Sequence, residues 1–255
     1  MNVKVFASGS GGNCALISDR GTHVLIDAGI SARRIRQSLS DAGLDIKDID
    51  GVLITHEHSD HVSGLKTLLK YTEIPLCAPH TVAARLCGAL PELVDFVRVI
   101  PTGTPVRVGA LNITAFHTPH DTDESVGYRV EGRGTFALAT DMGHVTDEVF
   151  AGLLGADAAL IESNHDLGML LDGPYPPRLK RRILSERGHL SNADCAVLAR
   201  RLAEAGTGKI ILGHLSRENN RPELAFAETE RELAGLDAEL YCAPVYGCLS
   251  VEVGR

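Results

Sequence analysis

The sequence lacks several features that would each indicate a definite class of protein. Its 255 residues include no tryptophan, and aromatic side chains make up only 4%, which argues against aromatic platforms for base stacking. No run approaches the roughly 18 apolar residues that span a membrane. The first residues show no charged segment followed by a long apolar one, so we expect no signal peptide and a cytoplasmic location.

The cysteines and the net charge exclude further classes. Six cysteines are present but none forms a Cys-x-x-Cys pair, so we expect reduced thiols rather than a cysteine zinc site. The net charge of −8 argues mildly against wrapping nucleic acid nonspecifically. Residues 178–187 are a local exception, with five basic residues and one acidic residue. This run predicts either a solvated helix face or a track for phosphates.

The sequence does contain an ordinary globular composition and many short β-rich runs. It is 44% hydrophobic and 23% charged, and its length allows one large domain or two small ones. Strand patterns interleave with helical patterns in both halves, with no low-complexity linker between them. We therefore expect a single α/β domain over residues 1–255, in which two mixed β-sheets pack face to face with helices outside.

Periodicity and turn residues predict the individual elements. Strands are expected at 3–8, 14–19, 23–28, 51–55, 74–79, 97–100, 105–108, 111–116, 125–131, 134–139, 157–162, 209–214, 238–242 and 248–253. Helices are expected at 31–43, 59–72, 80–90, 146–154, 176–187, 191–205 and 222–235.

The segment THEHSDH, residues 55–61, concentrates side chains of the kind that bind metal ions. Residues two apart in an extended chain face the same side, so His56 and His58 can hold one ion together. Asp60 and His61 fall in the first turn of the next predicted helix and can face a second ion. Imidazole suits zinc, iron and nickel, and carboxylate also suits manganese.

Other predicted strands also end in residues of metal-ligand type. The ends of strands in α/β sheets are where sites assemble. The residues concerned are Asp27, His117, His120, Asp141, Glu162, His165 and His214. The repetition of this placement predicts one site built from several strands.

The pattern His-x-His-x-Asp-His after a buried strand resembles the hallmark of the metallo-β-lactamase superfamily, whose fold is an αβ/βα sandwich. Further motifs resemble its WalJ/YycJ-like branch, which lies near the tRNA 3′-processing nucleases and the cyclic phosphodiesterases. These motifs are SGSGGNC (8–14), THEHSDH (55–61), PHD before VGYRV (119–130), ATDMGHV (139–145), ESNHD (162–166), YPPRLKRRI (175–183) followed by GHLSN (188–192), and LGHLSRENN (212–220).

The resemblance implies two divalent metal ions, Zn²⁺ or Mn²⁺, and a set of ligands. The ligands would be His56, His58 and His120 for the first ion, and Asp60, His61 and His214 for the second, with Asp141 bridging both. Asp27 would lie behind these ligands and orient them. His117 competes with His120 for its role, and we prefer His120 because His-Asp shortly before Gly-Tyr is the placement that the family shows.

The resemblance also implies a hydrolytic mechanism in which a hydroxide between the two ions attacks and Asp60 serves as base. In the related tRNA-processing nucleases, a histidine in a motif similar to GHLSN protonates the departing oxygen with support from a glutamate. His189 and Glu162 would be the matching pair, and His165 is another candidate for such a role. Residues that could contact a phosphate, or serve only as caps and turns, are Ser191, Asn192, Ser216, Arg217, Asn219 and Asn220.

These features predict a metal-dependent phosphodiesterase or nuclease. The resemblance implies a 5′→3′ exonuclease acting on DNA ends, and it leaves the oligomeric state open, a homodimer included. The alternative is a hydrolase of small substrates, such as a cyclic phosphodiesterase, a lactonase or a thioesterase, because the same metals polarise a carbonyl. A metal-free scaffold without enzymatic activity is a third hypothesis, and the complete set of ligand positions argues against it.

Overall fold

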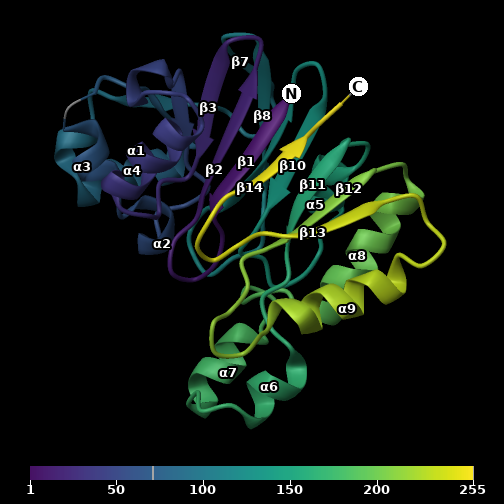
Figure 1. Ribbon diagram of the computed structural model, residues 1–255. Helices are drawn as coiled ribbons and strands as arrows, with labels where there is room; N and C mark the ends of the chain where they lie inside the picture. The colour runs from purple at the N-terminus through teal and green to yellow at the C-terminus, as the bar shows by residue number, and fades with distance from the viewer. Residues whose placement is uncertain (71, 255) are drawn as a thin grey trace.

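The computed structural model describes residues 1–70 and 72–254. Two seven-stranded β-sheets form its centre, and helices cover the outer face of each sheet (Figure 1). The expected architecture of two mixed sheets flanked by helices is therefore confirmed. Within the described ranges, none of the helices combines the length and apolar character that crossing a bilayer requires.

The first sheet joins an antiparallel half to a parallel half. Its strands in spatial order are β14 (Leu249–Glu252), β1 (Asn2–Ala7), β2 (Cys14–Asp19), β3 (Thr22–Ile26), β4 (Gly51–Leu53), β5 (Leu76–Ala78) and β6 (Val97–Val99). The pairs from β14 to β3 are antiparallel, and the pairs from β3 to β6 are parallel.

The second sheet repeats this plan. Its strands in spatial order are β7 (Val106–Val108), β8 (Leu111–His117), β9 (Val126–Glu131), β10 (Thr135–Ala139), β11 (Ala158–Glu162), β12 (Lys209–Gly213) and β13 (Glu239–Cys242). The pairs from β7 to β10 are antiparallel, and the pairs from β10 to β13 are parallel. Each sheet thus has a parallel half whose carboxyl ends share one edge.

The helices fall into two covering groups and one projection (Figure 1). The group on the first sheet is α1 (Ala32–Asp41), α3 (Leu65–Leu69) and α4 (His80–Ala89), and α2 (Ser59–Val62) precedes α3. The group on the second sheet is α5 (Asp147–Leu153), α8 (Asn192–Glu204) and α9 (Pro222–Glu232). Two short helices, α6 (Leu167–Asp172) and α7 (Pro177–Ile183), project from the end of the sandwich opposite the two termini (Figure 1). Short 3₁₀ turns occur at Ile46–Asp48 and Pro91–Leu93.

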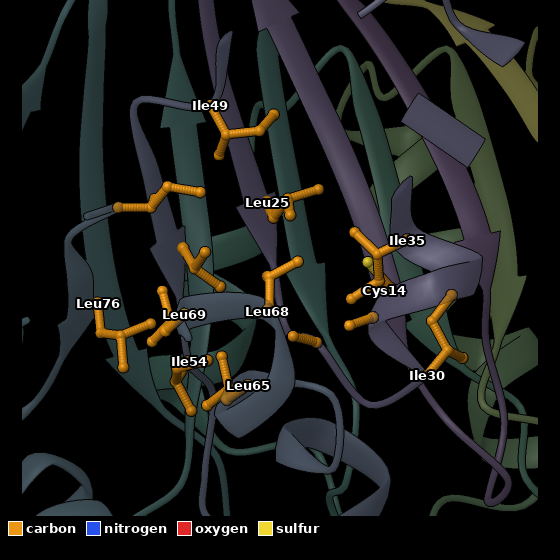
Figure 2. Close-up of a cluster of buried hydrophobic side chains, with 14 of the residues drawn as sticks. Cys14, Leu25, Ile30, Ile35, Ile49, Ile54, Leu65, Leu68, Leu69 and Leu76 are labelled. Carbon is orange, nitrogen blue, oxygen red and sulfur yellow. The ribbon is translucent and has the colours of Figure 1, made fainter. Parts of the chain in front are cut away.

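Three apolar layers hold these elements together, and the alternation of side chains along each strand assigns residues to them. On β3, Val24 and Ile26 belong to the layer between the two sheets, whereas Leu25 belongs to the layer under the helices of the first sheet. Figure 2 shows Leu25 in that outer layer together with Ile35 of α1 and Leu68 of α3. The third layer lies between the second sheet and its helices.

The structure corrects the helix expected at 59–72. It divides into α2 and α3 because the chain at Gly64 lies against the loop after β3. The Gly64 N–H donates to the carbonyl of Ala28 at 2.8 Å, and a Cβ on Gly64 would lie 2.2 Å from the carbonyl oxygen of Ile30. Residue 71, inside the predicted helix, lies outside the described residues.

Two further helix predictions were inaccurate. The helix expected at 176–187 ends at Ile183, whose carbonyl accepts a hydrogen bond from the His189 N–H at 2.9 Å. Helix α6 was not predicted, although its N-cap is ordinary, since the Asp166 side chain accepts from the Met169 N–H at 2.8 Å. Its six residues are too few to show a helical period.

Gly29 lies where the loop after β3 meets α2, and this contact generates a test of the fold. A Cβ on Gly29 would lie 1.6 Å from the carbonyl oxygen of Asp60. We expect Gly29→Ala to lower the free energy of unfolding by about 3 kcal/mol, because backbone would have to move. Gly88→Ala is the matched control, since Gly88 is an exposed position in α4 with open space around it. It should raise stability by about 0.5–1 kcal/mol. Urea unfolding followed by circular dichroism measures both, and equal stabilities would contradict the role of the contact.

Candidate metal centre

Polar side chains from both sheets converge at the carboxyl ends of the parallel strands. The residues from the first sheet follow β3 and β4, and they are Asp27, His56, His58, Asp60 and His61. The residues from the second sheet lie at or after the ends of β10, β11 and β12, and they are Asp141, Glu162 and His214. Apart from Asp27, these residues join His120 and His189 in close groups whose ligand atoms all lie within 4.8 Å of one another.

The first close group consists of His56, His58 and His120. His120 Nε2 lies 3.3 Å from His58 Nδ1. His56 is fully buried, and its Nε2 has no hydrogen-bond partner among the described residues. A buried nitrogen without a partner costs free energy, and a cation held by the three imidazoles would satisfy it. The group therefore fits one metal ion of the kind that prefers nitrogen ligands.

The second close group consists of Asp60, His61, Asp141 and His214. His61 Nε2 lies 3.2 Å from Asp141 Oδ2 and 3.4 Å from Asp60 Oδ2. The other oxygen of Asp141 lies 3.7 Å from His120 Nε2 in the first group. Asp141 thus faces both groups, and its buried Oδ2 has no hydrogen-bond donor in the described chain. The donors fit two cations with a shared carboxylate between them.

Three of these residues have left-handed backbone conformations. The φ angles are +61° at Asp27, +57° at Asp141 and +54° at His214. Asp27 and His214 come directly after a strand end and Asp141 comes two residues after one, so the turn redirects each side chain. Positive φ is uncommon outside glycine, and it clusters at functional sites. Nothing in the sequence indicated these conformations, although Asp and His tolerate them better than most residue types.

Asp27 and Thr55 hold the ligand histidines from behind. Asp27 Oδ2 lies 2.7 Å from His61 Nδ1, and Asp27 Oδ1 accepts from the Thr55 N–H at 2.9 Å. The Thr55 hydroxyl lies 3.1 Å from the Nδ1 atoms of both His56 and His61. These contacts leave Nε2 of both rings directed at the centre, which is how outer partners orient metal-binding histidines. Sequence reasoning singled out Asp27 but missed Thr55.

Asn13 is a second residue that sequence reasoning missed. Its side-chain amide nitrogen lies 3.1 Å from His61 Nε2 and 3.4 Å from Asp60 Oδ2. Its backbone N–H donates to the carbonyl of Asp60 at 2.8 Å. The glycine-rich loop before β2 therefore brings backbone close to the centre.

The protein environment separates the histidines by their affinity for protons. Burial, reinforced by the neighbouring His61, holds the pKa of His56 well below its usual value. Burial alone would also lower the pKa of His214, but the carboxylates of Asp141, Asp60 and Glu162 raise it to about 10. His56 is thus ready to ligate as neutral imidazole, whereas a metal ion at His214 would have to displace a proton.

His189 and Glu162 form a pair at the edge of the centre. His189 Nδ1 lies 2.7 Å from Glu162 Oε1, which also lies 3.0 Å from His214 Nδ1. Glu162 is fully buried, and its Oε2 accepts from the Met142 N–H at 2.8 Å. Burial would lower the pKa of His189, but the Glu162 carboxylate raises it. The ring of His189 remains 21% exposed, so it borders solvent.

The other candidate histidines lie outside both groups. His117 is 53% exposed and bonds to Glu148 at 2.9 Å, so the structure places His120 and not His117 beside His56. His165 is buried, and neither of its ring nitrogens has a hydrogen-bond partner among the described residues. A catalytic role for His165 stays a prediction.

The six candidate phosphate residues mostly bond within the protein. Asn192 Nδ2 donates to Asn220 Oδ1 at 2.9 Å, and both side chains are buried. Ser191 caps α8, since its hydroxyl accepts from the Asp194 N–H at 3.1 Å. The Asn219 N–H donates to the Ser216 hydroxyl at 3.2 Å in a buried turn. Arg217 alone is exposed, and it donates to the Tyr246 hydroxyl at 2.5 Å. These contacts match caps and turns, and binding of phosphate stays a prediction.

The loop that carries His120 is held by two arginines from the basic run. Arg187 donates to the carbonyl of His120 at 2.6 Å and also to that of Thr122. Arg182 donates to Asp121, whose Oδ1 lies 3.3 Å from His120 Nε2. The end of the basic run thus supports a candidate metal ligand, a role that its charge pattern did not indicate.

Asp27 generates a test of the metal centre. We expect Asp27→Ala to weaken Zn²⁺ binding 10- to 100-fold, because His61 loses the partner that orients its ring. The exposed Asp95, which has no contact with the centre, provides the matched control Asp95→Ala. Competition with a chromophoric chelator measures the affinities. Equal affinities in the two variants would show that Asp27 does not support a ligand.

Comparison with known proteins places this centre in a family. The model of the beta-lactamase superfamily domain matches residues 22–215. The chain is 36% identical to exodeoxyribonuclease YycJ of Bacillus anthracis over 229 residues, which cover 88% of this chain and 86% of that protein. It is 38% identical to exodeoxyribonuclease WalJ of Streptococcus pneumoniae over 237 residues, which cover 91% and 88%.

Solved structures show the same fold at low identity. The Zn²⁺-bound structure of PqqB from Methylobacterium extorquens aligns with a TM-score of 0.76 and 18% identity, covering 99% of this chain and 100% of that one. YhfI from Bacillus subtilis, a metallo-β-lactamase fold protein, aligns with a TM-score of 0.72 and 15% identity, covering 98% and 99%. The chain belongs to the metallo-β-lactamase superfamily and is a homologue of the WalJ and YycJ exodeoxyribonucleases.

Proposed function

We propose that this protein is a metal-dependent exonuclease that degrades DNA from the 5′ end. The observation that carries the proposal is the placement of the His189–Glu162 pair beside two candidate metal-binding groups, both of which Asp141 faces. This combination offers sites for two cations and a proton donor within one centre. Similarity to exodeoxyribonucleases over about nine-tenths of the chain supports DNA as the substrate. We further infer that residues 1–255 act as one domain, because both sheets contribute ligands.

The donor set suits two divalent ions, and Zn²⁺ and Mn²⁺ are the candidates. The chemistry that such ions supply when bound is a lowered pKa for a water molecule and polarisation of a phosphodiester. His56, His58 and His120 would hold one ion, and the second would be held by Asp60, His61 and His214. Asp141 would contact both.

Asp60 and His189 have the protonation states that hydrolysis requires. Burial would raise the pKa of Asp60, but hydrogen bonds with His214 and His61 lower it, so the carboxylate is ionised and can accept a proton from water. Glu162 keeps a proton on His189 by raising the pKa of that ring. Since Glu162 occupies Nδ1, the Nε2–H can donate to the departing sugar oxygen.

Labelled DNA tests the activity and its polarity. The purified protein, supplied with Zn²⁺ or Mn²⁺, should release labelled mononucleotides at once from a 5′-labelled duplex and only late from a 3′-labelled one. His120→Ala should lower the rate at least about 100-fold, because one metal loses a ligand. His117→Ala is the control and should leave the rate unchanged. If the protein does not cleave DNA but hydrolyses an acyl ester or bis(p-nitrophenyl) phosphate, the result would instead support a hydrolase of small substrates.

The leaving group tests the role of His189. His189→Ala should slow DNA cleavage by about 10²- to 10⁴-fold, the usual contribution of a general acid. It should slow hydrolysis of bis(p-nitrophenyl) phosphate far less, because p-nitrophenolate departs without protonation. The exposed His80 provides a control variant, His80→Ala. If His189→Ala lowers the rates on both substrates equally and also loses bound metal, His189 would instead be a metal ligand in the group that contains Asp141, Glu162 and His214.

A further inference from the structure

The basic residues of the run at 178–187 are of two kinds. Some have side chains that form contacts within the protein, and the others have side chains without such contacts among the described residues. Arg182 and Arg187 hold the loop of His120, as described above. Lys180 Nζ donates to the carbonyl of Leu171 at 2.5 Å and so joins α7 to α6. Arg178 and Arg181 are exposed, and neither has a hydrogen bond or an ion pair with any residue in the described ranges.

The two free arginines form one exposed basic face. They lie three residues apart on α7, and residues at that spacing are neighbours on a helix surface. The whole chain has a net charge of −8, so a cationic face stands out against its surface. Holding like charges side by side without counter-charges is unfavourable, and an anionic partner would remove that cost.

The position of α7 links this face to the metal centre. Helices α6 and α7 make up the projection at the end of the sandwich away from the termini (Figure 1). This projection is the chain segment that joins Glu162 to His189, the proton-donating pair. The bonds from Arg182 and Arg187 tie its far end to the loop of a metal ligand. An anion bound by Arg178 and Arg181 would therefore lie on the same chain segment that holds the loop of His120.

We propose that Arg178 and Arg181 bind the phosphate backbone of the DNA strand whose end enters the metal centre. This proposal rests on the proposed function. A helix of seven residues is about 10 Å long, which corresponds to roughly three nucleotides at 3.4 Å per step. The arginines would contact phosphates outside the metal centre, because they lie on α7 and belong to none of the close ligand groups. Such contacts position the strand without reading its sequence.

Substrate length and salt dependence test the proposal. In the double variant Arg178→Ala/Arg181→Ala, KM for a 20-nucleotide substrate should rise about 10-fold. The slope of log KM against log salt should fall by roughly 1.5, because two phosphate contacts are lost. The rate on bis(p-nitrophenyl) phosphate should not change, since that substrate does not reach α7. The control is Arg98→Ala/Arg107→Ala, which removes the same charge from exposed positions on the edge strands β6 and β7.

The outcomes separate this proposal from the proposed function. An unchanged KM, or an equal loss in the control variant, would overturn the docking face while leaving the nuclease intact. If the unmodified protein does not cut DNA, the nuclease proposal fails. Fluorescence anisotropy with a labelled 20-nucleotide strand then decides whether the double variant has lost binding. If light scattering gives a lower molar mass for the double variant than for the unmodified protein, and KM is unchanged, the face instead forms a contact between two copies of the chain.

Discussion

Contacts between buried carboxylates and imidazole rings decide how the candidate metal centre is built. Asp27, Asp141 and Glu162 are all buried, and each lies within 3.2 Å of a histidine nitrogen. A buried charge without a partner would cost several kcal/mol, so no one of these groups is tolerable alone. The mutual pairing makes the cluster acceptable inside the protein, and the neighbouring histidines lower the pKa of Asp141 and Glu162.

The sandwich supplies the rigid frame that this cluster requires. Parallel strands from both sheets end at one edge, and the left-handed turns at Asp27, Asp141 and His214 redirect their side chains inward. Close backbone contact at Gly29 and Gly64 then locks the loop after β3 against α2. Catalytic geometry is more precise when it is built on such elements than when it is built on free loops.

The segment between Glu162 and His189 combines two roles in one stretch of chain. Its last arginines support the loop of His120, and the exposed face of α7 offers charge to a partner. The proposed substrate contact and the support of a candidate metal ligand thus share one short segment. The relatives named exodeoxyribonucleases match nearly the whole chain, so the centre and the projection belong to the region of similarity.

Local patterns of the sequence predicted most of the element order and the chemical types of the candidate ligands. Short β-rich runs between turn residues predicted the strands, and the crowding of histidine and aspartate after β4 predicted a metal centre, because both signals are local. Only the tertiary structure decided which polar residues meet. It placed His120 rather than His117 beside His56, and it brought Asn13 and Thr55 to the ligand rings.

The same limit explains the elements that were predicted wrongly. Helical periodicity continued through residues 59–72, yet the helix breaks at Gly64 because that residue touches Ala28 and Ile30. Arg187 reaches His120 across 67 positions of sequence. Contacts of this kind depend on how the two sheets pack, and no local pattern of residues encodes them.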